Sequence, residues 1–440
     1  MDDGLTSTTL GGSTFTLASK YRPQRLVGSG SGGVVVAATC ADSSNEVAIK
    51  KIHIERDLTI ERHALAARRT LREISLISQL DHENVLGLLD LSCSGGGAAD
   101  FDHLYLVTPL MDADLHRVIR SPQPLTEQHV QFFMWQLLRG LEHLHACAVV
   151  HRDLKPANLL VNANCDLKIT DFGLARVIGG PAEEAPRDGL TSYVVTRWYR
   201  APEVLVGAEY GRAVDVWSAG CILAEMLGRA PLFPGRDALE QLRLILRVAA
   251  TLPGGSAERD HVPAAARVSL DRLAAEQAPA PLEALYPRAS ADALQMLGAL
   301  LAWDPARRPA AAAALALPFL DGYHDATTRP TAPRPIRLPE PATADDVRFL
   351  LLREVRRRAD ALPPAAAAAA PPAAVAVVAD AEDEAKRRAT DFAEQLAAYV
   401  DREQHTAPPP RAAEGVRDDA KPSSFFGALV RPLRQHGVAA

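Results

Sequence analysis

The chain has 440 residues, of which 48% are hydrophobic, and a formal net charge of −6 at pH 7. This length exceeds one ordinary core and suits two compact lobes followed by a tail. The small negative charge excludes a general electrostatic attraction to nucleic acid or to membranes, so neither is expected as a partner. The five cysteines are odd in number and form no CxxC pair, which argues against a disulfide framework or a zinc site.

The N-terminal residues MDDGLTSTTLGGSTF have neither a basic start nor an apolar run, so they do not resemble a signal peptide. No stretch reaches the roughly 18 uninterrupted apolar residues of a membrane-spanning helix. Together with the thiol pattern, these features predict a soluble protein inside the cell.

Short β-branched runs dominate the first quarter of the chain. The runs VVVAAT (34–39), EVAIKKI (46–52) and HLYLVTPLM (103–111) predict strands. Between them, apolar residues in 62–80 recur at helical spacing and predict one helix. We therefore expect a small β-rich lobe over residues 21–111.

From residue 112 to about 320 the pattern becomes helical. The stretches QHVQFFMWQLLRGLEHLHA (128–146) and ALEQLRLILRVAATL (238–252) are amphipathic and predict two of the longer helices. The fold class that follows is α+β, with a small β-rich N-terminal lobe and a larger helical C-terminal lobe.

After residue 325 the composition changes. TTRPTAPRPIRLPEP (327–341) predicts an extended proline-rich linker. Thr343 and Asp346 have the spacing of a helix cap, and a short helix is expected after them. Its apolar face would be formed by Val347, Leu350 and Leu351.

The C-terminal tail is rich in alanine and proline. Its low-complexity segment PPAAAAAAPPAAVAVVA (363–379) contains prolines that prevent one continuous helix. We expect residues 360–440 to be mostly disordered, with one possible helix at 380–403.

A glycine-rich turn, GSGSGGVV (28–35), follows the first predicted strand. Alone it is a weak signal, because about half of such turns are ordinary hairpin turns. Here Val-Ala-Ile-Lys (47–50) follows it, and Glu73 lies 23 residues further on in the predicted helix. A strand lysine and a helix glutamate can pair, which would aim Lys50 at the α- and β-phosphates of a nucleotide.

Two further motifs decide the chemistry. VVHRDLKPANLLV (149–161) contains His-Arg-Asp followed by an asparagine, and DLKITDFGLARV (166–177) brings Asp-Phe-Gly thirteen residues after that asparagine. Either motif alone could occur by chance. All of them in this order and at these spacings have a chance probability of about a percent or less.

Each part suits phosphoryl transfer, which needs positioning and charge neutralisation more than covalent chemistry. Asp153 would orient and deprotonate a substrate hydroxyl, and Lys155 would lie near the γ-phosphate. Asn158 and Asp171 would hold metal ions that neutralise charge on the transferred group.

These motifs resemble the protein kinases over roughly residues 21–322. The resemblance implies ATP and Mg²⁺ as cofactors and an activation segment at 171–203 that ends in Ala201-Pro202-Glu203. Such a glutamate pairs with an arginine, here expected to be Arg308. The implied organisation is 1–20 N-terminal segment, 21–111 N-lobe, 112–322 C-lobe, 323–359 linker and C-terminal extension, and 360–440 tail.

The resemblance also implies an adenine pocket. Thr108 occupies the gatekeeper position, the Pro109 carbonyl and the Met111 amide would contact adenine, and Asp114 would lie near the ribose. Because proline lacks only the N–H group, Pro109 costs nothing there. The other residues implied to bind ATP are Val27, Gly28, Gly30, Gly33, Val35, Ala48, Lys50 and Leu160.

The segment DGLTSYVVTRWYRAPE (188–203) resembles the activation segment of the mitogen-activated protein (MAP) kinases. Thr191 and Tyr193 stand at the two phosphorylated positions, and Ser192 between them replaces the Glu, Asp, Gly or Pro that is more usual. The implied phosphothreonine ligands are Arg72, Arg152 and Arg176, with Arg69 assisting, and the implied phosphotyrosine ligands are Arg197 and Arg200. A phosphate group would compensate these positive charges and order the segment.

The MAP-kinase resemblance also covers a helical insert at about 251–285 and the C-terminal extension helix. It implies Ser/Thr protein substrates followed by proline, an upstream dual-specificity MAP kinase kinase, and phosphatases. A monomer in the cytoplasm and nucleus is expected.

Two alternatives remain open from the sequence. A cyclin-dependent-type kinase shares HRDLKPANLL and WYRAPE, but the Thr-x-Tyr motif, Arg197 and the C-terminal extension argue against it. A catalytically dead scaffold would have lost Lys50, Asp153 or Asp171, and all three are present. Gly32, which replaces the usual aromatic tip of the glycine loop, is a weak argument for the scaffold.

Overall fold

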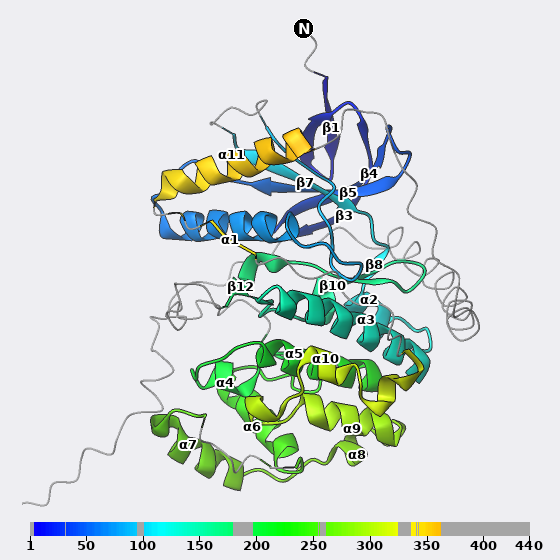
Figure 1. Cartoon of the computed structure of the whole chain (residues 1–440), viewed down its shortest axis with the longest axis vertical. Coiled ribbons are helices and arrows are strands. Elements are labelled where there is room, and N and C mark those ends of the chain that lie inside the picture. The colour runs from blue at the N-terminus through cyan, green and yellow to red at the C-terminus, as the bar shows by residue number, and fades with distance from the viewer. Residues whose placement is uncertain are drawn as a thin grey trace, which may run out of the picture. The chain divides into compact units, whose positions relative to one another are not determined.

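The structure is a computed structural model that describes residues 4–30, 32–94, 101–178, 197–253, 255, 261–323, 336–339, 341 and 343–361. The described chain forms two compact units, residues 4–178 with 310–361 and residues 197–309. Among the described helices, none is both long and apolar enough to cross a membrane. Figure 1 shows strands gathered in the N-terminal part and helices in the rest, so the predicted α+β class is confirmed.

A five-stranded antiparallel sheet forms the centre of the first unit, in the order β3-β4-β5-β7-β6. Its strands are β3 Tyr21–Gly30, β4 Gly33–Cys40, β5 Glu46–His53, β6 Asp90–Cys93 and β7 His103–Pro109. Ala48 of β5 pairs with Thr108 of β7, and Lys50 pairs with Val35 of β4. Because side chains alternate along a strand, these four residues share one face of the sheet.

The opposite face of this sheet is covered by an N-terminal hairpin. Its strands β1 (Leu5–Leu10) and β2 (Ser13–Ala18) pair in register without a break. Phe15 and Leu17 of β2 are buried against Val47, Ile49 and neighbouring side chains. Each such burial contributes about 1.5–3 kcal/mol. This hairpin was not predicted from the sequence, and it lies within the expected N-terminal segment 1–20.

Two helices pack side by side on the first unit. Helix α1 (Glu61–Ile77) precedes β6, and α11 (Ala344–Ala361) is the predicted C-terminal extension helix. Figure 1 shows α11 alongside α1, and α11 also contacts β6. The expected cap is present, since Thr343 N–H donates to Asp346 Oδ2 at 2.8 Å and Asp346 N–H donates to Thr343 Oγ1 at 3.2 Å. Of the predicted apolar face, Val347 and Leu351 are fully buried.

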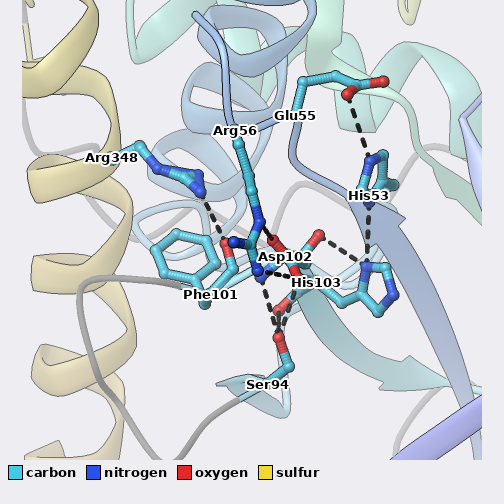
Figure 2. A network of polar contacts seen from close by, with 8 residues as sticks. All are labelled: His53, Glu55, Arg56, Ser94, Phe101, Asp102, His103 and Arg348. Atoms are coloured by element: carbon cyan, nitrogen blue, oxygen red, sulfur yellow. Dashed lines mark hydrogen bonds and ion pairs between the residues drawn. The ribbon is translucent and has the colours of Figure 1, made fainter.

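Arginine side chains attach α11 to backbone carbonyls. Arg348 donates to the Phe101 carbonyl at 2.9 Å and lies over the Phe101 ring, as Figure 2 shows. Next to it, Arg56 forms a bidentate ion pair with Asp102. Nearer the end of the helix, Arg358 donates to the Leu88 carbonyl at 2.7 Å. These bonds hold the helix at both ends.

The rest of the first unit consists of short strands and helices around α3 (Glu127–Ala146), the predicted 128–146 helix. Asn84 joins α3 to the strand that precedes Asp171, because its side chain donates to Gln136 and to the Leu167 carbonyl. The remaining elements are β8 Ala113–Asp114, α2 Leu115–Arg120, β9 Val149–Val150, η1 Pro156–Asn158, β10 Leu159–Val161, β11 Leu167–Ile169, η2 Phe172–Leu174, β12 Arg176–Val177, α10 Ala311–Ala314 and η4 Pro318–Tyr323.

Residues 112–178 belong to the same compact unit as the β-sheet. Backbone hydrogen bonds contribute to this grouping, such as Ile169 N–H to the Asn84 carbonyl at 2.9 Å and Leu86 N–H to the Ile169 carbonyl at 2.9 Å.

The second unit is helical. Its longest helix, α5 (Ala213–Gly228), is buried along most of its length and packs against α9 (Ala291–Leu300). The predicted helix at 238–252 is α6 (Ala238–Ala249). The other elements are α4 Pro202–Leu205, α7 Ala264–Ala275, α8 Leu282–Leu285 and η3 Pro305–Arg307, of which α7 and α8 lie in the expected insert.

A buried ion pair joins the two ends of the second unit. Both guanidinium Nη atoms of Arg308 contact the carboxylate of Glu203, at 2.6 and 2.9 Å, and neither side chain is exposed to solvent. Arg308 also donates to three backbone carbonyls and lies over the Trp217 ring. The expected Glu203–Arg308 pair is therefore confirmed.

Removing one member of this pair leaves the other charge buried and unpaired. We expect Arg308→Ala to lower the free energy of unfolding by about 3–5 kcal/mol. Thermal or urea unfolding of the purified protein measures this, with the exposed Arg288→Ala as the matched control. Equal stability of the two variants would contradict the prediction.

Candidate active site

The Lys50–Glu73 ion pair links the sheet to α1. Lys50 Nζ lies 2.7 Å from Glu73 Oε1, and both side chains are largely buried. Burial alone lowers the pKa of Lys50, but the charge and hydrogen bond of Glu73, with a contribution from Asp171, raise it above its ordinary value. Lys50 is therefore held as a cation at a fixed position on the face of β5 that it shares with Ala48.

The glycine-rich turn between β3 and β4 leaves open space beside its backbone. A Cβ atom at Gly28 or Gly30 would meet no atom within 4 Å. Gly33 has φ +121°, and a Cβ there would lie 2.2 Å from the Lys51 carbonyl oxygen, so only glycine fits. At Gly32 a Cβ would lie 3.9 Å from Lys50 Nζ, which places this tip directly over the lysine.

The residues expected to contact adenine and ribose come from β7, from β8 (Ala113–Asp114) and from the short segment between them. Thr108 and Pro109 end β7, beside Ala48, and the buried Met111 follows them. Asp114 caps α2 by accepting the Arg117 N–H at 2.9 Å, and it pairs with Leu160 in the small sheet of β8 and β10. Gly28 of β3 pairs with Val35 of β4, and Val27 directly precedes Gly28 in the same strand.

The catalytic-loop residues form a compact hydrogen-bonded group. Asp153 Oδ2 accepts hydrogen bonds from Lys155 Nζ at 2.7 Å and from Asn158 Nδ2 at 3.2 Å. Buried His151 lies beneath them, where Nε2 contacts the Thr170 carbonyl at 3.0 Å and Nδ1 accepts the Asp153 N–H at 3.3 Å. The neutral ring with its proton on Nε2 satisfies both bonds, and it fixes the Asp153 backbone.

Asp171 follows this loop in a strained backbone conformation. Its φ of 67° and ψ of 70° lie in the left-handed region, which non-glycine residues adopt rarely and mainly at functional sites. The next residue, Phe172, is fully buried with its ring edge against His151. This buried ring anchors the turn, and the negative charge of Asp171 acts on Lys50.

His151, Thr170 and Asn84 connect the site residues, although no role was predicted for them from the sequence. Thr170 N–H donates to the Asn158 carbonyl at 3.0 Å and so joins the loop to the strand before Asp171. Their bonds run largely through backbone groups, which side-chain patterns do not reveal.

Most of the arginines expected to bind phosphothreonine converge near Gly173. Arg72 Nη1 donates to the Gly173 carbonyl at 2.9 Å, and Arg152 Nη1 donates to the Leu174 carbonyl at 3.2 Å. Arg69 Cβ would lie 3.8 Å from a Cβ at Gly173, and Arg176 begins β12 just after it.

The remaining residues of the expected switch do not belong to the described part of the first unit. Arg197 and Arg200 belong to the second unit, where Arg197 Nη1 donates to the Arg236 carbonyl at 2.7 Å. Thr191, Ser192 and Tyr193 lie outside the described residues.

The first unit thus offers groups that fit ATP and Mg²⁺. Asn158 uses Nδ2 for Asp153, and its Oδ1 accepts no hydrogen bond from a described residue. The Asp171 carboxylate likewise accepts none within the described chain. Carboxylate and amide oxygens are ligands that Mg²⁺ prefers, while Lys50 and the open glycine backbone suit phosphates.

Comparison with known proteins agrees with this geometry. The protein kinase domain family matches residues 21–320. Mitogen-activated protein kinase 4 of Arabidopsis thaliana is 43% identical over 351 residues, which cover 78% of this chain and 89% of that protein. Mitogen-activated protein kinase 6 of Oryza sativa subsp. japonica is 43% identical over 359 residues, with the same coverage. The chain belongs to the MAP kinase family.

It is accordingly a Ser/Thr protein kinase that uses ATP and Mg²⁺. The predictions of the kinase fold, the enzyme class and the family are confirmed. The family assignment favours the MAP kinase prediction over the cyclin-dependent-type alternative.

The position of Gly32 over Lys50 allows a test of nucleotide shielding. We expect Gly32→Tyr to lower the KM for ATP, because an aromatic ring at this tip would cover the phosphates and a Cβ has room there. Steady-state kinetics at varied ATP concentration measures this change. The control is Gly87→Tyr, because Gly87 lies in an open loop where a Cβ would meet no atom within 4 Å. Gly12 in the N-terminal hairpin is unsuitable as a control position, because its φ of +77° would strain any side chain. An unchanged or higher KM for ATP would contradict the prediction.

Proposed function

We propose that this MAP kinase is switched on by phosphorylation of both Thr191 and Tyr193, and that it phosphorylates Ser or Thr followed by proline. The observation that carries the proposal is the convergence of Arg72 and Arg152 on the carbonyls of Gly173 and Leu174. These arginines come from α1 and from the catalytic loop, so one anionic group near them would connect both.

The physical basis is charge compensation. Phosphorylation adds about 1.5–2 negative charges and three strong acceptor oxygens. Guanidinium groups bind such oxygens in bidentate geometry, and this is roughly twice as strong as a neutral hydrogen bond. Because Arg72 directly precedes Glu73 in α1, a phosphate that holds Arg72 also stabilises the Lys50–Glu73 pair.

The roles proposed for the catalytic side chains follow from their contacts. Lys50 holds the α- and β-phosphates, and Asn158 and Asp171 bind the metal ions. Asp153 accepts the proton of the substrate hydroxyl at its carboxylate, while Lys155 beside it provides positive charge toward the γ-phosphate. When bound, ATP supplies the phosphoryl group and Mg²⁺ neutralises the charge that develops on it.

Protein substrates and upstream activators are implied by the family. We propose a dual-specificity MAP kinase kinase as the activator, phosphatases as the opposing enzymes, and a monomer as the working form. Ser192 between the two phosphorylated residues bears on which activator recognises the site. We propose that the kinase is located in the cytoplasm and in the nucleus and signals in both compartments.

The catalytic assignment predicts loss of phosphate transfer in Asp153→Ala. Without the carboxylate that orients the hydroxyl, we expect the rate to fall by about 10²–10⁴-fold, the usual contribution of a positioned acid–base group. Labelled phosphate transfer to myelin basic protein by the activated enzyme measures this rate. The matched control is Asp166→Ala. Asp166 is an exposed aspartate in the turn between β10 and β11, where its carboxylate accepts a hydrogen bond from Asn162. Equal phosphate transfer by the two variants would contradict the role of Asp153, whereas no transfer by the unmodified protein would favour a scaffold that works without catalysis.

The switch predicts that Thr191→Ala and Tyr193→Phe each remove most of the activation. We expect an activated sample to carry phosphate on both residues, because each phosphate would bind a different arginine set. Mass spectrometry of the segment alongside activity measures this, with Ser192→Ala as the matched control. Full activation of either variant would contradict dual phosphorylation while leaving the catalytic assignment intact.

A further inference from the structure

A groove rich in arginine lies where α11 meets the end of α1. Its volume is about 520 Å³, and it is lined by Arg337 from the segment before α11 and by Arg353, Arg356 and Arg357 of α11. Gln79, just past the end of α1, also lines it, together with Leu338, Pro339, Glu354 and Asp360. Below, "arginine groove" refers to the space lined by these nine residues.

Most of the positive charge in the arginine groove has no ion-pair partner among the residues that the structure describes. Arg337, Arg353 and Arg356 form no ion pair with any side chain in the described part of the chain. Arg357 is already engaged, with Nη2 2.8 Å from Glu354 Oε2 and 2.6 Å from Ser78 Oγ. Asp360 adds one further negative charge to the lining. The arginines therefore outnumber the carboxylates by two, which favours an anionic occupant.

The chain itself contains a matching anion a short distance downstream. Residues 362–379 carry no charge, and the first charged residues after α11 are the four acids of Asp380-Ala-Glu382-Asp383-Glu384. This acidic segment, residues 380–384, has the densest negative charge of the C-terminal tail. Arginine pairs well with carboxylates because its planar fork can bind both oxygens.

The uncharged linker is long enough to return the acidic segment to the groove. An extended chain of this length can span about 60 Å, at roughly 3.3 Å per residue. The groove includes Asp360, one residue before α11 ends, so the required reach is short. Because the segment and the groove belong to one chain, their binding is intramolecular, which favours charge pairing that would be weak between separate molecules.

We propose that the acidic segment 380–384 binds intramolecularly in the arginine groove. Its carboxylates pair with Arg337, Arg353 and Arg356. Because the groove spans α11, Gln79 and residue 337, the bound segment clamps α11 against the end of α1. Gln79 already bonds to the Arg337 carbonyl at 3.2 Å, so the clamp reinforces an existing contact. The tail thereby supports the helix that carries Glu73.

Hydrogen–deuterium exchange of the full-length protein tests this binding. The test variant is Asp380→Asn/Glu382→Gln/Asp383→Asn/Glu384→Gln, and the control Asp401→Asn/Glu403→Gln/Asp418→Asn/Asp419→Asn removes the same charge elsewhere in the tail. We expect several-fold faster amide exchange over residues 353–361 in the test variant and no change in the control. Salt at 1 M should produce the same increase in the unmodified protein, because it screens exposed charges beyond about 3 Å.

A peptide of residues 377–385 provides the second measurement. Labelled with a fluorophore, it should bind the neutralised full-length variant, whose groove is free, and fail to bind when Arg353→Gln and Arg356→Gln are added. Arg288→Gln in the same background is the control and should leave binding unchanged. Equal exchange rates in test and control variants would overturn the proposal. Binding of inorganic pyrophosphate but not of the peptide would also overturn it, and would assign the groove to a phosphate ligand.

Discussion

The Lys50–Glu73 ion pair is the interaction on which the rest of the site depends. A buried ammonium group without a carboxylate would be costly to keep charged, so the position of Lys50 requires α1 to stay against the sheet. From the preceding residue of α1, Arg72 reaches the Gly173 carbonyl and so links the helix to the turn that carries Asp171. The sheet, the helix and the turn that carries Asp171 are thus joined through one turn of α1.

Sequence patterns were sufficient for the parts whose chemistry depends on side-chain identity and spacing. The β-branched runs became β4 and β5, and the apolar spacing of 62–80 became α1, which begins at Glu61 and ends three residues early at Ile77. The pairing of Lys50 with Glu73 could be predicted from a strand lysine followed by a helix glutamate, and that of Glu203 with Arg308 from the resemblance to protein kinases.

The remainder depends on contacts that leave little trace in composition. The hairpin β1–β2 is mostly serine, threonine and glycine, and only Phe15 and Leu17 point into the core, so it resembled a loop. The arginines of α11 bind backbone carbonyls, whose positions follow from the tertiary fold and not from any residue type. The bonds of His151 to the backbone escaped prediction for the same reason.

The hairpin has a consequence for where the folded unit begins and ends. The family match spans residues 21–320. Phe15 and Leu17, which precede this range, are buried against the sheet. Helix α11, which follows this range and carries the buried Val347 and Leu351, packs against α1 and β6. A fragment cut at the limits of the family match would expose one apolar surface on each side of the small lobe. Homology boundaries and the smallest soluble fragment of this kinase therefore differ at both ends, and expression should start before Leu5 and continue past Ala361.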